Sequence, residues 1–179
     1  MTAPEDKAGD IGIGVAEDAG SGVAEQDGGC ATSEQELRRD AVTREVCRGV
    51  CRLLRDLGHA CIAEMPLPNG RRADVVALAQ NGDLWIVEVK SSVEDFRTDQ
   101  KWHEYQPYCD AFAFAVAPEF PREILPEEPG LIVADAFGGA VLREAPVTPL
   151  AGARRKALTL AFGRLAALRA GGAPALDLE

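Results

Sequence analysis

Two acidic residues and a lysine gather where a strongly apolar stretch of the sequence ends. The run LWIV at positions 84–87 leads directly into Glu88 and Lys90, and Asp74 precedes Glu88 by 14 positions (88 − 74 = 14). Because side chains alternate along a strand, Glu88 and Lys90 would point to the same face. Charged groups are costly to bury unless they pair or bind a metal. The pattern therefore predicts a site at the end of a buried strand.

The chemistry open to these three residues is metal-assisted hydrolysis. Asp74 and Glu88 carry the hard oxygen ligands that Mg²⁺ or Mn²⁺ prefers, and a hairpin would bring the two carboxylates together. Such an ion can acidify a bound water and stabilise charge on a phosphoryl oxygen, while Lys90 can position that water or help to deprotonate it. A structural alternative stays open, in which Glu88 and Lys90 form an ion pair and Asp74 belongs to a turn.

Hydrophobic periodicity predicts the elements that would position these residues. Apolar residues at helical spacing indicate a long helix over residues 33–57, and a capping-box pattern at Ser91 indicates another over 91–106. A last helix is expected over 151–170. Apolar runs bounded by turn residues are typical of strands near 60–67, 72–79, 83–90, 111–117, 131–135 and 140–144. Helices that flank a mixed sheet give an α/β fold.

The composition is that of one domain with an acidic extension. Of the 179 residues, 46% are hydrophobic and 27% are charged, enough for a core without disulfides. Residues 1–33 hold seven acids against Lys7, so the rest of the chain carries only −10 − (−6) = −4. We predict a disordered acidic leader over 1–33, a folded domain over 34–170 and a flexible tail over 171–179. A nearly balanced body leaves a nucleic-acid partner possible.

Several protein classes are disfavoured. Five cysteines without a CxxC pair and two isolated histidines indicate neither a disulfide framework nor a zinc site. No apolar run reaches the roughly 20 residues that span a bilayer, and the start of the chain lacks the pattern of a signal peptide. We therefore expect a soluble cytoplasmic protein without a membrane partner.

The spacing of Asp74, Glu88 and Lys90, D(x13)ExK between two predicted helices, resembles the PD-(D/E)XK nuclease superfamily with its restriction-endonuclease-like fold. The stretches GRRADVVAL, LWIVEVKSSVEDF and LPEEPGLIVADAFGG, within roughly positions 40–165, resemble the MmcB family of bacterial DNA repair proteins. This resemblance implies a role in DNA repair, a nuclease-type core, and DNA and other repair proteins as partners. It also implies that Asp74 and Glu88 bind Mg²⁺ or Mn²⁺ and that Lys90 is the catalytic lysine.

The sequence departs from the superfamily pattern at two points. Ala73 stands where the proline of PD would be, a change that the superfamily tolerates. Many members also use a glutamate from the first helix as a further metal ligand. Glu45 is the candidate on the predicted helix and Glu64, on the first predicted strand, is its rival.

Basic and aromatic residues near the motif are candidates for nucleic-acid binding. Arg71 and Arg72 directly precede Asp74 and would lie near a bound phosphate. The others are Lys101, Trp102 and Tyr105, which combine a charge with aromatic surfaces for stacking. For Trp102 and Tyr105 the alternative is packing of a helix on the sheet.

Arginines also occupy the polar faces of the first predicted helix, where they could be solvated or could face phosphates; spacing alone favours the solvated interpretation. These are Arg38, Arg39, Arg44, Arg48, Arg52 and Arg55.

Taken together, the residues and the resemblance predict a metal-dependent deoxyribonuclease that acts in DNA repair. A catalytically silent DNA-binding or partner-recruiting module with the same fold is the alternative. RNA as the substrate also stays open, because no residue in the pattern reads a 2′-hydroxyl.

Overall fold

The sheet at the centre of the molecule has six strands, in the order in which they occur along the chain. The computed structural model describes residues 28–98 and 101–172, so residues 1–27 of the predicted leader and 173–179 of the predicted tail lie outside the described residues. The strands are β1 (Ala60–Pro66), β2 (Arg72–Leu78), β3 (Leu84–Lys90), β4 (Ala111–Val116), β5 (Gly130–Ala134) and β6 (Gly139–Arg143). All six lie where the sequence predicts them.

Strand direction changes across the sheet, which makes it mixed. β1, β2 and β3 pair antiparallel, β3, β4 and β5 pair parallel, and β6 returns antiparallel on β5. The first two hairpins turn at Gly70 and Gly82, whose φ values of 80° and 88° suit glycine. The parallel pairing of β3 and β4 brings Lys90 opposite Val116, so the carboxyl ends of the parallel strands meet at one edge of the sheet.

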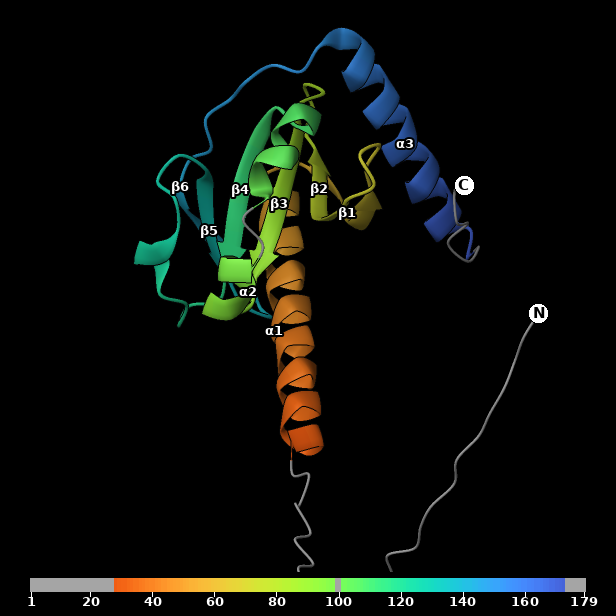
Figure 1. Ribbon diagram of the computed structural model, residues 1–179. Coiled ribbons are helices and arrows are strands. Elements are labelled where there is room, and N and C mark those ends of the chain that lie inside the picture. Colours follow the sequence, from red (N-terminus) through yellow and green to blue (C-terminus); the bar gives the residue numbers. More distant parts are fainter. Residues whose placement is uncertain (1–27, 99–100, 173–179) are drawn as a thin grey trace, which may run out of the picture.

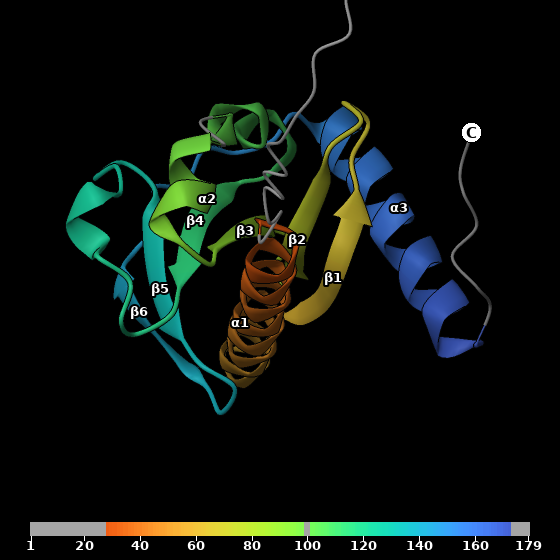
Figure 2. The same cartoon turned by 60° about the horizontal axis from the view of Figure 1, so that its bottom comes forward.

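Helices cover both faces of the sheet, which confirms the predicted α/β class (Figures 1 and 2). The long helix α1 (Gly28–Asp56) lies along one face and extends beyond the sheet at its N-terminal end (Figure 1). The other face packs against α2 (Val93–Thr98), the short 3₁₀ helices η1 (Trp102–Glu104), η2 (Gln106–Tyr108) and η3 (Arg122–Ile124), and α3 (Gly152–Ala170). No helix in the described part of the chain is both long and apolar enough to cross a membrane.

The side of α1 that faces the sheet is apolar. Val46, Val50 and Leu54 recur at helical spacing and are fully buried. They pack in one cluster with Val75 of β2 and Val87 of β3. Each buried Val or Leu side chain contributes about 1.5–3 kcal/mol through removal of apolar surface from water. This face therefore fixes α1 across the strands that carry the candidate site.

The second predicted helix differs from the structure. The sequence predicts a helix over 91–106, but α2 ends at Thr98 and the described chain continues as 3₁₀ turns from Trp102. The Thr98 hydroxyl bonds back to carbonyls of its own helix, and the 3₁₀ turns bury Trp102 and Tyr105 against β4. Tertiary packing of these two rings thus overrides the helical periodicity.

The two predicted helix starts also shift. α1 begins at Gly28 rather than Ser33, because a helix once formed gains one hydrogen bond with each residue added. At α2 the cap is Ser92 rather than Ser91: the Asp95 amide donates to the Ser92 hydroxyl at 3.1 Å. The Asp95 carboxylate in turn accepts from the Ser91 amide at 3.0 Å. The serine cap is therefore one residue later than the sequence pattern indicates, and the Asp95 carboxylate bonds to the residue before the cap rather than to the amide of the cap itself.

Candidate active site

The hairpin of β2 and β3 brings Asp74 and Glu88 together. The paired register of β2 and β3 ends at Val75 and Val87, and Asp74 and Glu88 are the residues directly beyond that last pair. Asp74 is anchored there because its Oδ2 accepts a hydrogen bond from the Val89 amide at 2.8 Å.

Glu88 and Lys90 are charged side chains in the interior. They are only 6% and 2% exposed, and the Lys90 Nζ lies 3.8 Å from Oε1 of Glu88. The Tyr105 hydroxyl donates to the same Oε1 at 3.2 Å. The carboxylate of Glu88 is therefore held from two directions, by an ammonium on its own strand and by a phenol from the segment after α2.

Burial raises the pKa of Asp74 above its usual value. The Val89 amide and the Lys90 charge act against this rise, and the nearby Asp95 carboxylate adds to it. The environment thus penalises the charged form of Asp74, as expected of a carboxylate that lacks full compensation from the chain. Burial, together with the charge of Asp74, also raises the pKa of the Cys47 thiol to about 12, so this thiol is not a nucleophile at neutral pH.

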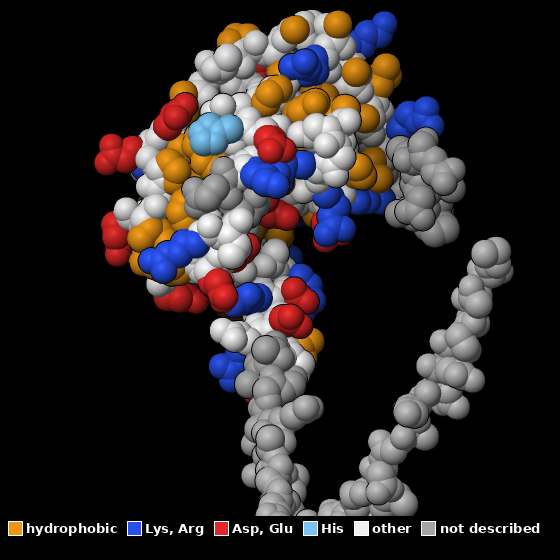
Figure 3. All heavy atoms as spheres, in the orientation of Figure 1, with side chains coloured by type: hydrophobic (Ala, Val, Ile, Leu, Met, Phe, Trp, Pro, Cys, Tyr) orange, Lys and Arg blue, Asp and Glu red, His pale blue; other side chains and the backbone are white. Residues whose placement is uncertain are grey.

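The three predicted catalytic residues line one pocket of about 330 Å³. The pocket opens at the carboxyl end of β3, between α1 and α2. Acidic and basic side chains lie side by side on the part of α1 that extends below the sheet (Figure 3). Its lining residues are Arg39, Asp40, Thr43, Asp74, Glu88, Val89, Lys90, Ser91, Asp95 and Thr98. A polar pocket at the ends of parallel strands is where α/β folds tend to bind ligands.

Neither of the two glutamates proposed as a further metal ligand lines this pocket. Glu45 is exposed on α1 and lies 4.0 Å from Arg48. Glu64 lies opposite Asp74 on β1, but its φ of 51° interrupts the alternation of the strand, and its exposed carboxylate lies 3.9 Å from Arg72. The carboxylate that α1 contributes to the pocket is Asp40, which sequence reasoning missed. No motif marks it; only the packing of α1 across the sheet places it there.

Asp74 and Glu88 nevertheless fit a hard divalent cation. Within the residues that the structure describes, no three His, Cys, Asp or Glu side chains form a cluster ready to hold a metal. Mg²⁺ does not need such a cluster, because it is commonly bound by one or two carboxylates together with water and substrate phosphates. Two carboxylates that line a polar pocket supply that ligand set.

The predicted nucleic-acid-binding residues divide into two groups. Arg72 and Lys101 are exposed, whereas the Arg71 side chain is only 20% exposed and pairs with Glu104 at 2.6 Å. Trp102 and Tyr105 are 4% and 3% exposed, and both rings stack on a phenylalanine of β4. Their placement fits packing of this segment on the sheet, and the structure gives Tyr105 a further contact, with Glu88.

The opposite ends of β3 and β4 carry a different buried carboxylate, Asp110. It accepts hydrogen bonds from the Leu84 and Leu150 amides, both at 2.8 Å, and a bidentate pair from Arg155 at 2.5 and 2.8 Å. Burial by itself would raise the pKa of Asp110, but these donors hold it below its usual value. Arg155, at the start of α3, is therefore neutralised within the fold.

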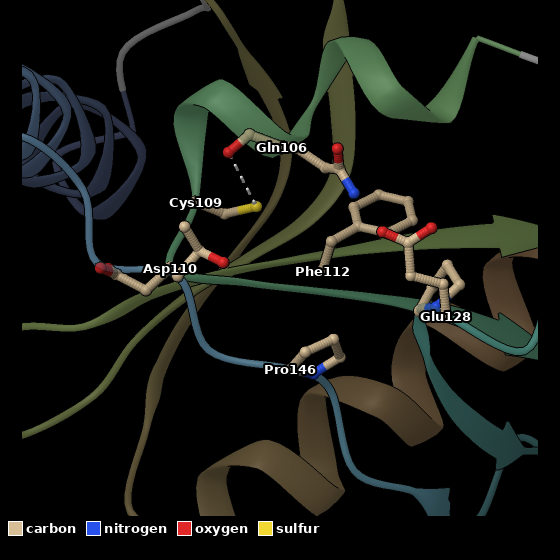
Figure 4. A pocket seen from close by; sticks show the side chains of 8 residues that line it. Gln106, Cys109, Asp110, Phe112, Glu128 and Pro146 are labelled. Carbon is tan, nitrogen blue, oxygen red and sulfur yellow. Dashed lines mark hydrogen bonds between the residues drawn. The ribbon is translucent and has the colours of Figure 1, made fainter.

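A second pocket, of about 240 Å³, lies beside Asp110 (Figure 4). It is lined by Gln106, Cys109, Asp110, Phe112, Glu128, Pro129, Pro146 and Thr148. Burial raises the pKa of the Cys109 thiol to about 12, and its sulfur donates to backbone carbonyls of the preceding turns. With Asp110 engaged by Arg155 and the Cys109 thiol protonated, neither of these two groups is prepared for catalysis.

Fold and site together define a mixed α/β protein with two carboxylates and a lysine in a pocket at the ends of its parallel strands. The family model described as DNA repair protein MmcB-like matches residues 31–175. The chain therefore belongs to the MmcB-like DNA repair protein family, as its sequence predicts. Membership indicates a role in DNA repair and, with it, an interaction with DNA.

A solved structure from Silicibacter pomeroyi, described as a protein of unknown function, is similar to this chain. The two are 41% identical, the match covers 76% of this chain and 97% of that one, and the TM-score is 0.67. That likeness supports the fold and adds no activity. No curated protein matches the chain.

Proposed function

We propose that this protein is a metal-dependent nuclease of the PD-(D/E)XK type that hydrolyses DNA phosphodiesters during repair. The observation that carries this proposal is the meeting of Asp74, from β2, with Glu88 and Lys90, from β3, in one pocket. Two buried charges at the end of a central strand are costly, and a catalytic task explains why they are kept. The mixed sheet between helices is consistent with that superfamily.

Each residue has a distinct role in this proposal. Asp74 and Glu88 would hold Mg²⁺ or Mn²⁺, which supplies Lewis-acid polarisation of a phosphoryl oxygen and lowers the pKa of a bound water. Lys90, 3.8 Å from Glu88, directs a positive charge into the pocket, where it can offset the charge that develops on the phosphodiester. Tyr105 orients the Glu88 carboxylate through its hydroxyl. Asp40 and Arg39 complete the polar wall on the α1 side.

The test is the isosteric variant Glu88→Gln, compared with Glu144→Gln on the exposed segment after β6. We expect Glu88→Gln to lower Mg²⁺- or Mn²⁺-dependent cleavage of labelled DNA by at least about 100-fold. It should also abolish Mn²⁺ uptake in calorimetry. DNA binding in chelator should persist, and circular dichroism should show a folded chain. Glu144→Gln should match the wild type in all three assays. Undiminished cleavage by a folded Glu88→Gln protein would rule out the proposed mechanism.

A DNA-binding or partner-recruiting module without turnover is the second candidate. The observation in its favour is that, in the described part of the chain, no third acidic, cysteine or histidine ligand joins Asp74 and Glu88. A wild-type protein that binds DNA, takes up no Mn²⁺ and cleaves neither DNA nor RNA would establish this candidate. Cleavage of RNA in preference to DNA would keep the site but change its substrate.

A further inference from the structure

The outward face of α1 carries a row of arginines that the pocket does not use. This arginine row consists of Arg44, Arg48, Arg52 and Arg55, and all four are exposed. At 100° per residue they fall within an arc of about 80°, on the side of the helix opposite its buried face. They span about 16 Å along the helix axis.

The positive charge of the row is poorly compensated by the protein. Among the residues that the structure describes, Arg48 alone of the row lies within salt-bridge distance of a carboxylate, that of Glu45 at 4.0 Å. Arg52 donates instead to the backbone carbonyl of Phe137 at 3.3 Å. Asp56 is the other acid near this end of the helix. Asp40 lies one turn before Arg44 on the same helix, so four arginines against three acids leave a local surplus of +1 on a body that is net negative.

An exposed aromatic ring stands beside this row. Phe137, in the turn between β5 and β6, is 84% exposed, the most exposed of the large hydrophobic side chains described. The tip of this hairpin lies next to α1 (Figure 2). Isolated apolar residues on a surface are common, so exposure alone does not mark a binding site.

The turn that presents Phe137 is firmly built. Asp135 Oδ1 accepts from the amides of Phe137 and Gly138, at 2.8 and 3.1 Å. Gly49 lets the turn approach α1 closely, because a side chain there would collide with the carbonyl oxygens of Asp135 and Gly138. The Arg52 guanidinium makes a further contact with the turn, through its hydrogen bond to the Phe137 carbonyl. A fixed turn that holds an aromatic ring in solvent loses little conformational entropy when it binds a partner.

We propose that the arginine row and Phe137 form a DNA-binding surface separate from the catalytic pocket. The row is straight, and one strand of a duplex places a phosphate about every 3.4 Å along its axis, so about 16 Å of helix faces several phosphates. Arg44 follows Thr43, which lines the pocket, so one DNA molecule can reach both regions. Phe137 would contact base edges or an unstacked base beside the backbone. The proposal rests on the proposed function only in that DNA is the partner.

The test is binding of a fluorescent 30-base-pair duplex, measured by anisotropy in EDTA so that the pocket holds no metal. The row variant is Arg44→Glu, Arg48→Glu and Arg55→Glu, which leaves the Arg52 contact with the turn intact. Its matched control is Arg122→Glu, Lys156→Glu and Arg164→Glu, with the same change in net charge at exposed positions elsewhere. We expect the row variant to bind at least about tenfold more weakly than the control, with a salt dependence reduced by about 2–3 units of slope.

A smaller change tests the ring. Phe137→Ala should weaken binding about fivefold or more, whereas Leu142→Ala, at another exposed apolar position on β6, should leave it unchanged. Equal affinity of the row variant and its charge-matched control would overturn the proposal, since net charge would then explain any loss. So would failure of the wild type to bind duplex DNA at all.

Failure of this proposal is distinguishable from failure of the nuclease proposal. Because the row does not line the pocket, the row variant should take up Mn²⁺ as the wild type does. Row-dependent DNA binding without metal uptake or cleavage would remove the nuclease proposal and keep the surface. Metal-dependent cleavage that the row variant carries out as well as the wild type would remove the surface and keep the nuclease proposal.

Discussion

The two ends of the parallel pair β3 and β4 each hold a partly or fully buried carboxylate, and the pKa of that carboxylate is shifted in opposite directions at the two ends. At the amino end, Asp110 receives two backbone amides and a bidentate arginine, and its pKa is lowered. At the carboxyl end, burial raises the pKa of Asp74, whose carboxylate lines an open polar pocket with Glu88 and Lys90. A buried carboxylate that the chain satisfies stabilises the fold. One left partly uncompensated beside a pocket is available to a ligand.

The largest effect expected on stability is at the amino end. Asp110→Asn should lower the free energy of unfolding by about 3 kcal/mol, because it leaves Arg155 and two amides poorly paired. Urea unfolding at pH 7 measures this loss. Asp83→Asn is the control, since Asp83 meets the same arginine at 3.3 Å but is partly exposed, and it should cost well under 1 kcal/mol. Equal losses in the two variants would contradict the comparison.

The pH dependence of the Asp110 contribution follows from the direction of its pKa shift. The folded-state pKa is lowered, so the stabilisation is fully present above the unfolded value of 3.8 and disappears as the pH falls through the folded value. The difference in stability between wild type and Asp110→Asn should therefore be constant above about pH 5 and shrink in more acidic buffer. A difference that grows on acidification would show that another group is responsible.

An intermediate effect is expected for Tyr105, which supports the carboxyl end. Tyr105→Phe removes the hydroxyl that donates to Glu88 at 3.2 Å and should lower the free energy of unfolding by about 1 kcal/mol. If Asp74 and Glu88 hold a metal, Mn²⁺ affinity in calorimetry should also fall by about tenfold. Tyr108→Phe changes the same group on a neighbouring ring and should leave Mn²⁺ affinity unaltered. Unchanged metal affinity in Tyr105→Phe would limit that residue to packing.

The smallest effect has the opposite sign. In chelator at pH 7, Asp74→Asn should slightly raise the free energy of unfolding, because the raised pKa of Asp74 means that folding penalises its charge. This gain should diminish as the pH falls through the raised folded-state pKa and vanish below the unfolded value of 3.8, where both proteins are neutral at this position. A loss of stability at pH 7 would place Asp74 with Asp110 and erase the contrast between the two ends.

Much of the fold follows from local sequence patterns. The six strands show apolar runs bounded by turn residues, and α3 keeps its helical periodicity, so both lie where the sequence predicts them. The segment after Ser91 does not form the single helix that the sequence predicts. Its apolar spacing fits a helix, but it also fits 3₁₀ turns that bury the same two rings, Trp102 and Tyr105. Those rings pack on Phe112, a residue on a strand that local pattern cannot connect to them.

The residues of the candidate site also divide into those that local sequence predicts and those that only tertiary packing places. The sequence by itself determined Asp74, Glu88 and Lys90, since strand alternation and a hairpin of fixed length bring them to one place. Only the tertiary structure decided which further carboxylate lines the same pocket: Asp40 of α1 does, while Glu45 and Glu64 are exposed elsewhere. The physical reason is the separation along the chain between the residues that set each position. Register within a hairpin is set by neighbouring residues, but the position of α1 across the sheet is set by apolar packing between segments far apart in the chain.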